Sequence, residues 1–521
     1  MAGRAPAAGA AWEVSALEPA GCAGMVWRRA GRRWPGLLEY RDIYAGGCLR
    51  ASASPDAITV ANPATEEIMG AAPAASGQDV DIAVRAAREA FDSGPWPRAD
   101  RAERATAMDR LAAALENRAR DAACLVTAEM GMPITASRLH NAEVPVTILR
   151  YYAALARALP LEEVRAAVNF RGHTIVRQEP VGVSAVIAPW NYPLALTLSQ
   201  LAPALAAGCT VVLKPAAQTC LSAYLLAEAF EAADFPPGVF NLVTGTHEVA
   251  ELLARHPGVD KVSFAGPAPV GRRIAIACGE TFKSVNLELG GKAAAIVLED
   301  ADPAATPVSL GRLAFANSGQ TCFAASRVLA PRSRYEETVA GLREQAAAMV
   351  VGDPMAPETA MGPLVSPHRR AGVEAYVTAS TAEGARVVTG GRRPAAPVRG
   401  YYYEPTVLTW GSAPAAAVAA LGEVFGPVVT VIPYAGEAEA VTIANEAGPG
   451  LAGTVWTSDP DHGVDIARRI HVGTFGVNLY VPDLGSPWGG KAGGQGSTYG
   501  PECLGAYLRP KSVFLPEPSP A

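Results

Sequence analysis

The stretch VGVSAVIAPWNYPLALTLSQLAPALAAGCTVVLK, residues 181–214, decides the fold. Its composition predicts a strand at 181–188, an apolar helix at 194–207 and a second strand at 210–213. Both strands are apolar throughout rather than alternating, which is typical of strands covered on both faces. The stretch therefore predicts a β-α-β unit in a buried parallel sheet.

The same stretch is apolar enough to suggest a membrane span. Pro189, Asn191, Pro193 and Gly208 divide it into pieces. Each piece is shorter than the ~20 uninterrupted apolar residues that a bilayer crossing requires. We expect no membrane association.

Composition excludes several classes of function. The chain has 521 residues, half of them apolar, with a net charge of -6 and a pI near 5.8. This length predicts two or more domains, and the absence of long basic runs argues against a nucleic-acid surface or a polybasic membrane anchor. The eight cysteines form no CxxC pair and no zinc-type Cys/His cluster, so no metal site is expected. The partners should be small molecules.

The rhythm of strands and helices extends along the chain. Residues 79–90 place Val80 and Val84 on one helical face, and the pattern at 101–131 predicts one long helix. GVFNLVTG (238–245) and VDKVSFAG (259–266) are short apolar strands separated by a helical pattern. This alternation predicts α/β layers.

The segment NFRGHTIVRQEPVG, residues 169–182, differs from its surroundings. Apolar and polar residues alternate at 174–177, which predicts an antiparallel ribbon at a sheet edge that pairs with a neighbour.

Three residues are candidates for covalent and acid–base chemistry. Cys322 lies among small and polar residues in NSGQTCFAASR, and Glu288 lies between leucines in NLELGGK, where an apolar setting raises a carboxyl pKa. Asn191, between prolines in PWNYP, could donate a hydrogen bond to an oxyanion. Considered singly, each has a structural alternative: a small buried residue, an outward strand residue and a turn residue.

Two features of the sequence are compatible with binding of a nucleotide. Gly266 and Gly271, in SFAGPAPVG, lie where a strand should lead into a helix, and Lys214 ends a predicted strand at the edge where α/β sheets bind ligands. A tight turn and a solvated lysine would explain them equally well.

Together these motifs carry a resemblance. The motifs PWNYPL, KPAAQT, FAGPAPVG, LELGGK, SGQTC, GPLVS, EPTVL, EVFGPV and PWGGKAGGQG occur in the order and approximate spacing of the aldehyde dehydrogenase superfamily. The resemblance extends from about Tyr40 to Val513. It implies an oxidoreductase that uses NAD or NADP to oxidise a small-molecule aldehyde to a carboxylic acid.

The resemblance also implies roles for the three candidates. The Cys322 thiolate would attack the aldehyde, and the Asn191 amide with the backbone N–H of Cys322 would hold the oxyanion of the thiohemiacetal. After hydride transfer Glu288 would activate the water that hydrolyses the thioester.

By the same resemblance, Lys214 and Glu423 would hold the two riboses of the cofactor and Phe425 would pack near the nicotinamide. The remaining implied cofactor residues are Trp190, Gly266, Gly271 and Leu289. The aromatic residues Tyr192, Trp190, Phe315 and Phe323 suggest an apolar substrate tunnel, although packing would explain them as well.

Three departures from the family pattern affect this reading. Ala217 replaces a glutamate that binds the adenine-side ribose in many members, which leaves the choice between NAD and NADP open, and Pro267 replaces a serine. WGGKAGGQGSTYG is one residue shorter before its lysine and lacks the family's arginine–glutamate pair after the last glycine.

The implied fold is α/β, with a Rossmann-type cofactor domain (36–157 and 181–290), an α/β catalytic domain (291–494) and a small β bridging element (158–180 and 495–521). Residues 1–35 are expected to be a disordered extension, because their arginine pairs precede no apolar signal segment. We expect a cytoplasmic homodimer or homotetramer joined through the ribbon.

Other functions stay open at this stage. A coenzyme-A-acylating semialdehyde dehydrogenase and a catalytically silent family member would share the fold. A cysteine acyltransferase or hydrolase would need a histidine partner, and the seven histidines lie in no motif that suggests one.

Overall fold

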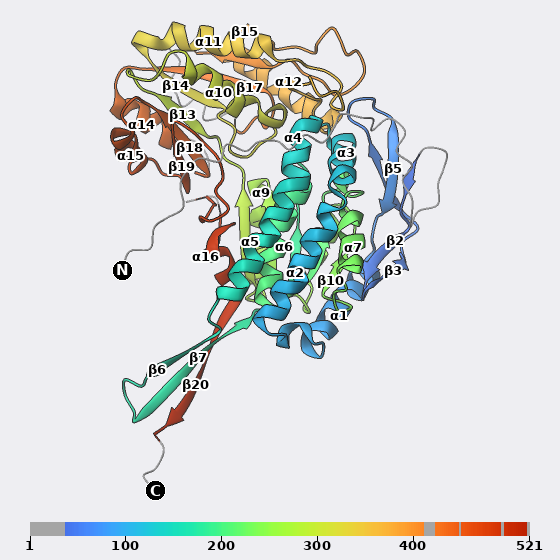
Figure 1. Cartoon of the computed structure of the whole chain (residues 1–521). Helices are drawn as coiled ribbons and strands as arrows, with labels where there is room; N and C mark the ends of the chain where they lie inside the picture. The colour runs from blue at the N-terminus through green and yellow to red at the C-terminus, as the bar shows by residue number, and fades with distance from the viewer. Residues whose placement is uncertain (1–36, 411–421, 447–449, 491–493, 518–521) are drawn as a thin grey trace.

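The computed structural model describes residues 37–410, 422–446, 450–490 and 494–517. The extension expected at 1–35 lies outside these residues. The described chain contains two large sheets with helices packed on their faces, and a small three-stranded sheet that projects from the body (Figure 1).

The first large sheet contains the predicted β-α-β unit. β8 (Val183–Ile187) and β9 (Thr210–Lys214) are parallel neighbours with Val183 opposite Thr210, and α6 (Pro193–Ala207) connects them, so this prediction is confirmed. The strand order is β12 (Ser284–Leu289), β11 (Lys261–Gly266), β8 (Val183–Ile187), β9 (Thr210–Lys214), β10 (Phe240–Leu242), β2 (Asp42–Ala45) and β3 (Cys48–Ala51).

The helices that cover this sheet explain why α6 is apolar all round. α6 packs on β8 and β9 on one side and on α2 and α5 on the other, and Figure 1 shows these helices side by side. The helices of this half are α1 (Gly77–Asp92), α2 (Arg101–Glu116), α3 (Ala119–Met130), α4 (Ile134–Arg138), α5 (Val144–Ala158), α6 (Pro193–Ala207), α7 (Ala223–Ala232), α8 (His247–Arg255) and α9 (Ala268–Gly279).

The N-terminal helices confirm one prediction and correct another. α1 buries Val80 and Val84 as expected. The single helix predicted at 101–131 is wrong, because Arg118 leaves the helical region with φ -111° and ψ 11° and separates α2 from α3. The predicted end is confirmed at Gly131, whose φ of 82° is left-handed.

The second large sheet is parallel except for one edge pair, β15 with β16. Its order is β15 (Arg386–Thr389), β16 (Thr406–Thr409), β17 (Val428–Tyr434), β14 (Arg327–Pro331), β13 (Ala294–Val297), β18 (Ala452–Trp456) and β19 (Thr474–Val477). Its helices are α10 (Ala305–Phe315), α11 (Tyr335–Ala348), α12 (Pro367–Ala382), α14 (Glu437–Asn445) and α15 (Pro460–Ala467).

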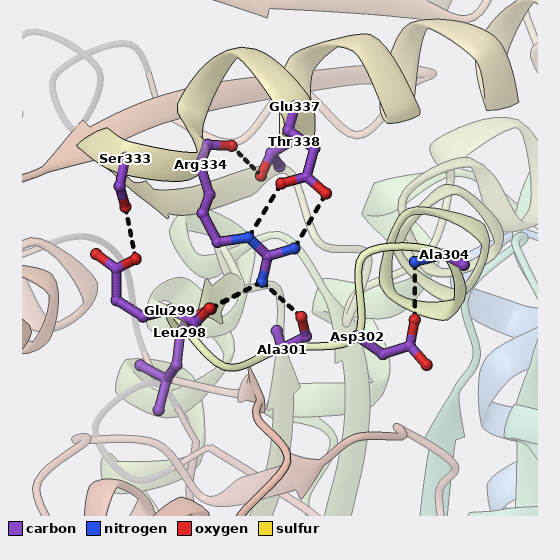
Figure 2. A network of polar contacts seen from close by, with 9 residues as sticks. All are labelled: Leu298, Glu299, Ala301, Asp302, Ala304, Ser333, Arg334, Glu337 and Thr338. Atoms are coloured by element: carbon purple, nitrogen blue, oxygen red, sulfur yellow. Dashed lines mark hydrogen bonds and ion pairs between the residues drawn. The ribbon is translucent and has the colours of Figure 1, made fainter.

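Arg334 connects two parts of this half. Its guanidinium donates to the backbone oxygens of Leu298, Glu299 and Ala301, which follow β13, and to the Glu337 carboxylate in the first turn of α11 (Figure 2). The network holds the start of α11 against the end of β13, away from the cavity described below.

The antiparallel ribbon predicted around 174–177 is confirmed, but its expected place at a sheet edge is wrong, because this strand lies between two others. β7 (Gly172–Pro180) pairs antiparallel with β6 (Glu162–Ala166) and with β20 (Leu508–Pro516), which follows α16 (Gly500–Gly505). A further small sheet consists of β1 (Leu38–Glu39), β5 (Ile68–Pro73) and β4 (Ala57–Ala61). Among the residues that the structure describes, no helix is long and apolar enough to cross a bilayer.

Candidate active site

A cavity of about 490 Å³ opens between the two large sheets. Its walls contain all three candidate chemical residues and five of the seven candidate cofactor residues: Asn191, Glu288, Cys322, Trp190, Gly266, Leu289, Glu423 and Phe425. Lys214 and Gly271 are not part of this lining. Residues far apart in the sequence thus meet in one space.

The loop that carries Cys322 has an unusual backbone. Between α10 and β14, Asn317, Ser318 and Gly319 all have positive φ values, of 51°, 58° and 70°. A Cβ on Gly319 would lie 2.0 Å from the oxygen of Gly426, so only glycine fits there. Such backbone conformations are costly and occur mainly at functional sites, where surrounding contacts maintain them.

Polar side chains of the loop supply these contacts. Ser318 donates to the oxygen of Gly362 at 2.8 Å, and Gln320 accepts from the backbone N–H of Val365 at 2.9 Å. The loop is therefore fixed to the segment around GPLVS before any ligand binds.

Cys322 is partly exposed to the cavity. Burial raises the pKa of its thiol above the usual range, and the carboxylates of Glu423 and Glu288 raise this pKa further. The thiol therefore holds its proton at neutral pH. Attack on an aldehyde requires that this proton be removed.

Alkylation of exposed thiols would not report Cys322 alone, because Cys48 is exposed as well. Its side chain is exposed, whereas Cys209, Cys220, Cys278 and Cys503 are buried. Exposure alone would let Cys48 react with iodoacetamide, so accessibility sets Cys322 apart from the four buried thiols but not from Cys48.

Asn191 approaches the loop of Cys322 from the other sheet. Its Nδ2 donates to the oxygen of Gln320 at 3.1 Å, and its backbone oxygen accepts from the Asn317 amide at 2.9 Å. An amide nitrogen carries two hydrogens, so a second donor remains for an oxyanion formed at Cys322.

Glu288 turns inward from β12 and is 7% exposed, which contradicts the alternative of an outward strand residue. Its Oε1 accepts from the Thr498 hydroxyl at 2.6 Å, whereas its Oε2 has no hydrogen-bond partner within the described chain. Burial raises the pKa of Glu288 to about 8, and the Thr498 bond opposes this rise. A carboxylate with one free oxygen and this pKa is suited to accept a proton from water.

The glycine-rich motif explains how Thr498 reaches Glu288. β12 is an edge strand, and the backbone N–H of Leu287 donates to the oxygen of Gln495 at 2.8 Å. A Cβ on Gly496 would lie 2.1 Å from Oδ1 of Asn286, so this close approach requires glycine. Sequence reasoning noted the altered motif here but did not identify Thr498.

The cofactor end of the cavity lies at the start of α9. Pro267, Ala268 and Pro269 line the cavity directly after β11. Gly271 lies behind them, and a Cβ there would meet Cδ2 of Leu289 at 2.5 Å, so it allows α9 to pack closely on β12. Pro267 precedes the helix, as its N-cap, and is compatible with it.

Aromatic and charged side chains form the opposite wall. The rings of Trp190 and Phe425 meet edge to face at 5.5 Å, and the Arg369 guanidinium lies 5.7 Å and 5.5 Å from their centroids. Sequence reasoning missed Arg369, although it follows the GPLVS motif closely.

Lys214 ends β9, two strands from β11 at the same edge of the parallel sheet, and is 6% exposed. Burial lowers its pKa to about 8. Ala217, three residues on, begins a short 3-10 turn and offers no carboxylate.

Of the aromatic residues expected to line a substrate tunnel, Phe323 and Tyr192 lie beside the candidate residues. Phe323 packs on Tyr480 with centroids 5.0 Å apart, and the Tyr192 hydroxyl bonds to Thr321 at 2.8 Å. Phe315 instead belongs to the core of the second half, with residues such as Leu342 and Val431, so its tunnel role is not supported. Among the described residues, no group of three or more His, Cys, Asp or Glu side chains is arranged to hold a metal ion.

Comparison with known proteins gives consistent results. Residues 49–513 match the model of the aldehyde dehydrogenase family. The chain is 46% identical to geranial dehydrogenase of Castellaniella defragrans over 480 residues, which cover 92% of this chain and 99% of that protein.

Solved structures are equally similar. Mycobacterium tuberculosis aldehyde dehydrogenase complexed with NAD+ superposes with a TM-score of 0.89 at 40% identity, covering 93% of this chain and all of that one. A Pseudomonas syringae aldehyde dehydrogenase C variant complexed with NAD+ and octanal gives a TM-score of 0.87 at 36% identity, with 93% and 98% covered. The chain therefore belongs to the aldehyde dehydrogenase family.

Proposed function

We propose that this aldehyde dehydrogenase oxidises an apolar aldehyde to the carboxylic acid with NAD, through a thiohemiacetal and a thioester on Cys322 that water hydrolyses. The observation that carries the proposal is the convergence of Cys322, Asn191 and Glu288 on one cavity. Aldehyde-dependent reduction of NAD+ by the purified protein tests it, and absence of this reaction with every aldehyde tried would contradict it.

The cavity fits a dinucleotide. The start of α9, a helix of 12 residues, opens into it, and helix N-termini favour phosphate groups. The Glu423 carboxylate and the Phe425 ring are available to a ribose and a nicotinamide ring. When bound there, NAD+ supplies the hydride acceptor for the adduct on Cys322.

The chain's own groups and solvent account for the other steps. Cys322 Sγ, which is partly exposed, loses its proton to solvent as it bonds to the carbonyl carbon, and the second Asn191 N–H with the Cys322 backbone N–H stabilises the oxyanion. In hydrolysis Glu288 Oε2 takes a proton as the water oxygen bonds to the thioester carbon. The C–S bond then breaks and the thiolate leaves.

We expect Asn191→Ala to lower kcat by about 10²–10³-fold, the usual loss when one oxyanion donor is removed. The KM for NAD should change little, because Asn191 donates to the loop of Cys322 rather than to the helix end of the cavity. Steady-state kinetics check this. Asn191→Asp, which keeps the shape but adds a negative charge, should be at least as inactive; an active Asp variant would contradict the role.

Hydrolysis is favoured over transfer to coenzyme A because Glu288 is present and one of its oxygens has no hydrogen-bond partner among the described residues. A coenzyme-A-acylating enzyme must prevent water from competing with its thiol acceptor. A catalytically silent member is disfavoured, since all three chemical residues are in place.

An apolar substrate is favoured by the surroundings of Cys322. Phe323 and Tyr480 pack together there, and Trp488 lines the cavity. A charged group buried among these rings would lack partners. A panel of aliphatic, aromatic and terpenoid aldehydes against a carboxylate-bearing semialdehyde tests this, and a preference for the semialdehyde would contradict it.

Tolerance of NADP follows from Ala217. A glutamate there would accept from ribose hydroxyls and repel a 2′-phosphate, and alanine does neither. We predict that wild-type kcat/KM for NAD exceeds that for NADP by less than about a thousandfold, roughly 4 kcal/mol at 1.4 kcal/mol per decade.

Ala217→Glu should raise this ratio by about 10–100-fold, the range expected for hydrogen bonds to a charged group. Ala217→Gln is the matched control, since it offers an acceptor without the charge and should shift the ratio less. An unchanged ratio in the Glu variant would show that another loop sets the preference.

We further propose the domain division 36–157 with 181–290, 291–494, and 158–180 with 495–521. The strands of each sheet fall within these ranges, including the ribbon formed by β6, β7 and β20. The exposed ribbon side chains Val164, Val513 and Phe514 support assembly of a cytoplasmic homodimer or homotetramer through this element.

A further inference from the structure

A chain of buried hydrogen bonds ends on Glu288. The Gln200 Nε2 donates to Thr498 Oγ1 at 2.8 Å, and Thr498 Oγ1 donates to Glu288 Oε1 at 2.6 Å. Behind Gln200, the Tyr507 hydroxyl donates to Gln200 Oε1 at 3.1 Å, and the Ser263 hydroxyl lies 2.8 Å from that of Tyr507.

The members come from three distant parts of the sequence but are all buried. Ser263, Thr498 and Tyr507 are 0% exposed and Gln200 is 4% exposed. They are provided by β11 (Ser263), the segment after the glycine-rich motif (Thr498), the turn before β20 (Tyr507) and α6 (Gln200). A buried polar group is costly unless it has a hydrogen-bond partner, and here these side chains supply one another's partners.

The amide orientations of Gln200 and Asn286 give every bond in this arrangement one direction. Gln200 Oε1 accepts from both Tyr507 and Asn286 Nδ2, the latter at 2.8 Å, and its Nε2 faces Thr498. A hydroxyl has one hydrogen, so Thr498, which accepts from Gln200, has its own hydrogen directed at Glu288. By the same reasoning Tyr507 donates to Gln200 and Ser263 donates to Tyr507.

We propose that Thr498, oriented by Gln200 and Tyr507, is a positioning residue that holds Glu288 Oε1 and thereby presents Oε2 as the oxygen that takes the proton from water. This inference rests on the proposed function of Glu288 and adds residues to it. The chain orients and does not conduct, because the Gln200 amide has no proton to pass on at neutral pH.

Two consequences follow for hydrolysis of the thioester. The Thr498 bond stabilises the carboxylate form, so its loss should raise the pKa that governs hydrolysis. Loss of the Thr498 bond also removes the fixed orientation of the Glu288 carboxylate, so the plateau rate of hydrolysis at high pH should fall as well. Acylation of Cys322 and hydride transfer do not use Oε2 and should be affected much less.

Other titratable groups lie around Glu288. Cys322, Tyr480, Tyr499, Cys503 and Tyr507 all interact with it electrostatically, and burial raises the pKa of each. These five groups are neutral near pH 7 to 8, but burial also brings the pKa of Glu423 to about 7 and that of Lys292 to about 8, and both line the same cavity. The part of the hydrolysis profile that disappears in Glu288→Gln is therefore the part that reports Glu288.

The test measures thioester hydrolysis in single turnovers, with enzyme in excess of aldehyde and rapid acid quenching across a pH series. Thr498→Val removes the hydroxyl and keeps the shape. The substitution should slow hydrolysis about tenfold and shift the midpoint of the rate–pH profile to a higher pH by about one unit. This is the effect of losing a hydrogen bond to a charged group. Thr498→Ser keeps the hydroxyl and should restore both.

Tyr507→Phe removes one of the two donors to Gln200 and should give a smaller change in the same direction. Thr210→Val is the matched control, because Thr210 is also buried and donates to the backbone oxygen of Ala87, away from Glu288. It should leave the pH profile unchanged.

A Thr498→Val enzyme with the wild-type hydrolysis rate and profile would overturn the inference, as would failure of Thr498→Ser to restore them. Equal slowing of hydride transfer and hydrolysis would also overturn it, since this indicates a general structural role. The wild-type enzyme distinguishes failure of this inference from failure of the proposed function. If the proposed function is wrong, the wild type forms no thioester on Cys322.

Discussion

Cys322→Ala should abolish aldehyde oxidation, with a loss in kcat on the order of 10⁴ or more, as when a covalent nucleophile is removed. Alanine leaves no atom that can bond to the carbonyl carbon. The cofactor end of the cavity, at the start of α9, is unaffected, so binding of NAD should be retained. Steady-state rates and titration of NAD binding by fluorescence check the two parts separately.

Cys278→Ala is the matched control for this variant. Cys278 is fully buried in the core that packs α9 against the sheet, and it does not line the cavity. Its replacement should lower stability slightly and leave kcat almost unchanged. Substantial residual activity in Cys322→Ala would refute the assignment of the nucleophile. An alkylation test should use a Cys48→Ser background, because Cys48 is exposed.

Glu288→Gln should slow thioester hydrolysis by about 10²–10⁴-fold, the usual contribution of a general base. The first turnover should still produce NADH rapidly, because glutamine has nearly the same shape and can still accept from Thr498. Stopped-flow measurement should therefore show a burst of NADH followed by a slow phase. A variant in which burst and slow phase fall together would contradict the role of Glu288 as base.

The pH dependence of hydrolysis provides a second readout. Burial raises the pKa of Glu288 to about 8, and the base acts only when ionised. The wild-type hydrolysis rate should therefore rise with pH through about 8 and then level off. This rise should disappear in Glu288→Gln.

The sequence predicted those parts of the fold that depend on local pattern. The β-α-β unit at 181–214 was predictable because its strands and helix are apolar in continuous runs and are separated by proline and glycine. The break at Arg118 was not, because the apolar spacing continues across it and only the packing of α2 and α3 requires a change in direction.

The candidate site, like the fold, was predictable from the sequence only in part. Cys322, Asn191 and Glu288 were identified from motifs, but the orientation of Glu288 could not be, because a strand residue between two leucines can face either side. Thr498 lies 210 positions from Glu288 in the sequence and reaches it only through the close approach of Gly496 to β12. Arg369 was missed because a cation that packs on two aromatic rings from other parts of the chain has no local signature.

The most direct test of the central claim is mass spectrometry of Glu288→Gln quenched in acid shortly after aldehyde and NAD+ are added. The peptide containing Cys322 should gain the mass of the aldehyde less two hydrogen atoms, as a thioester requires. The adduct should disappear slowly, with release of the free acid. An adduct on another residue, no adduct at all, or acyl-coenzyme A as the main product when coenzyme A is present would contradict the account.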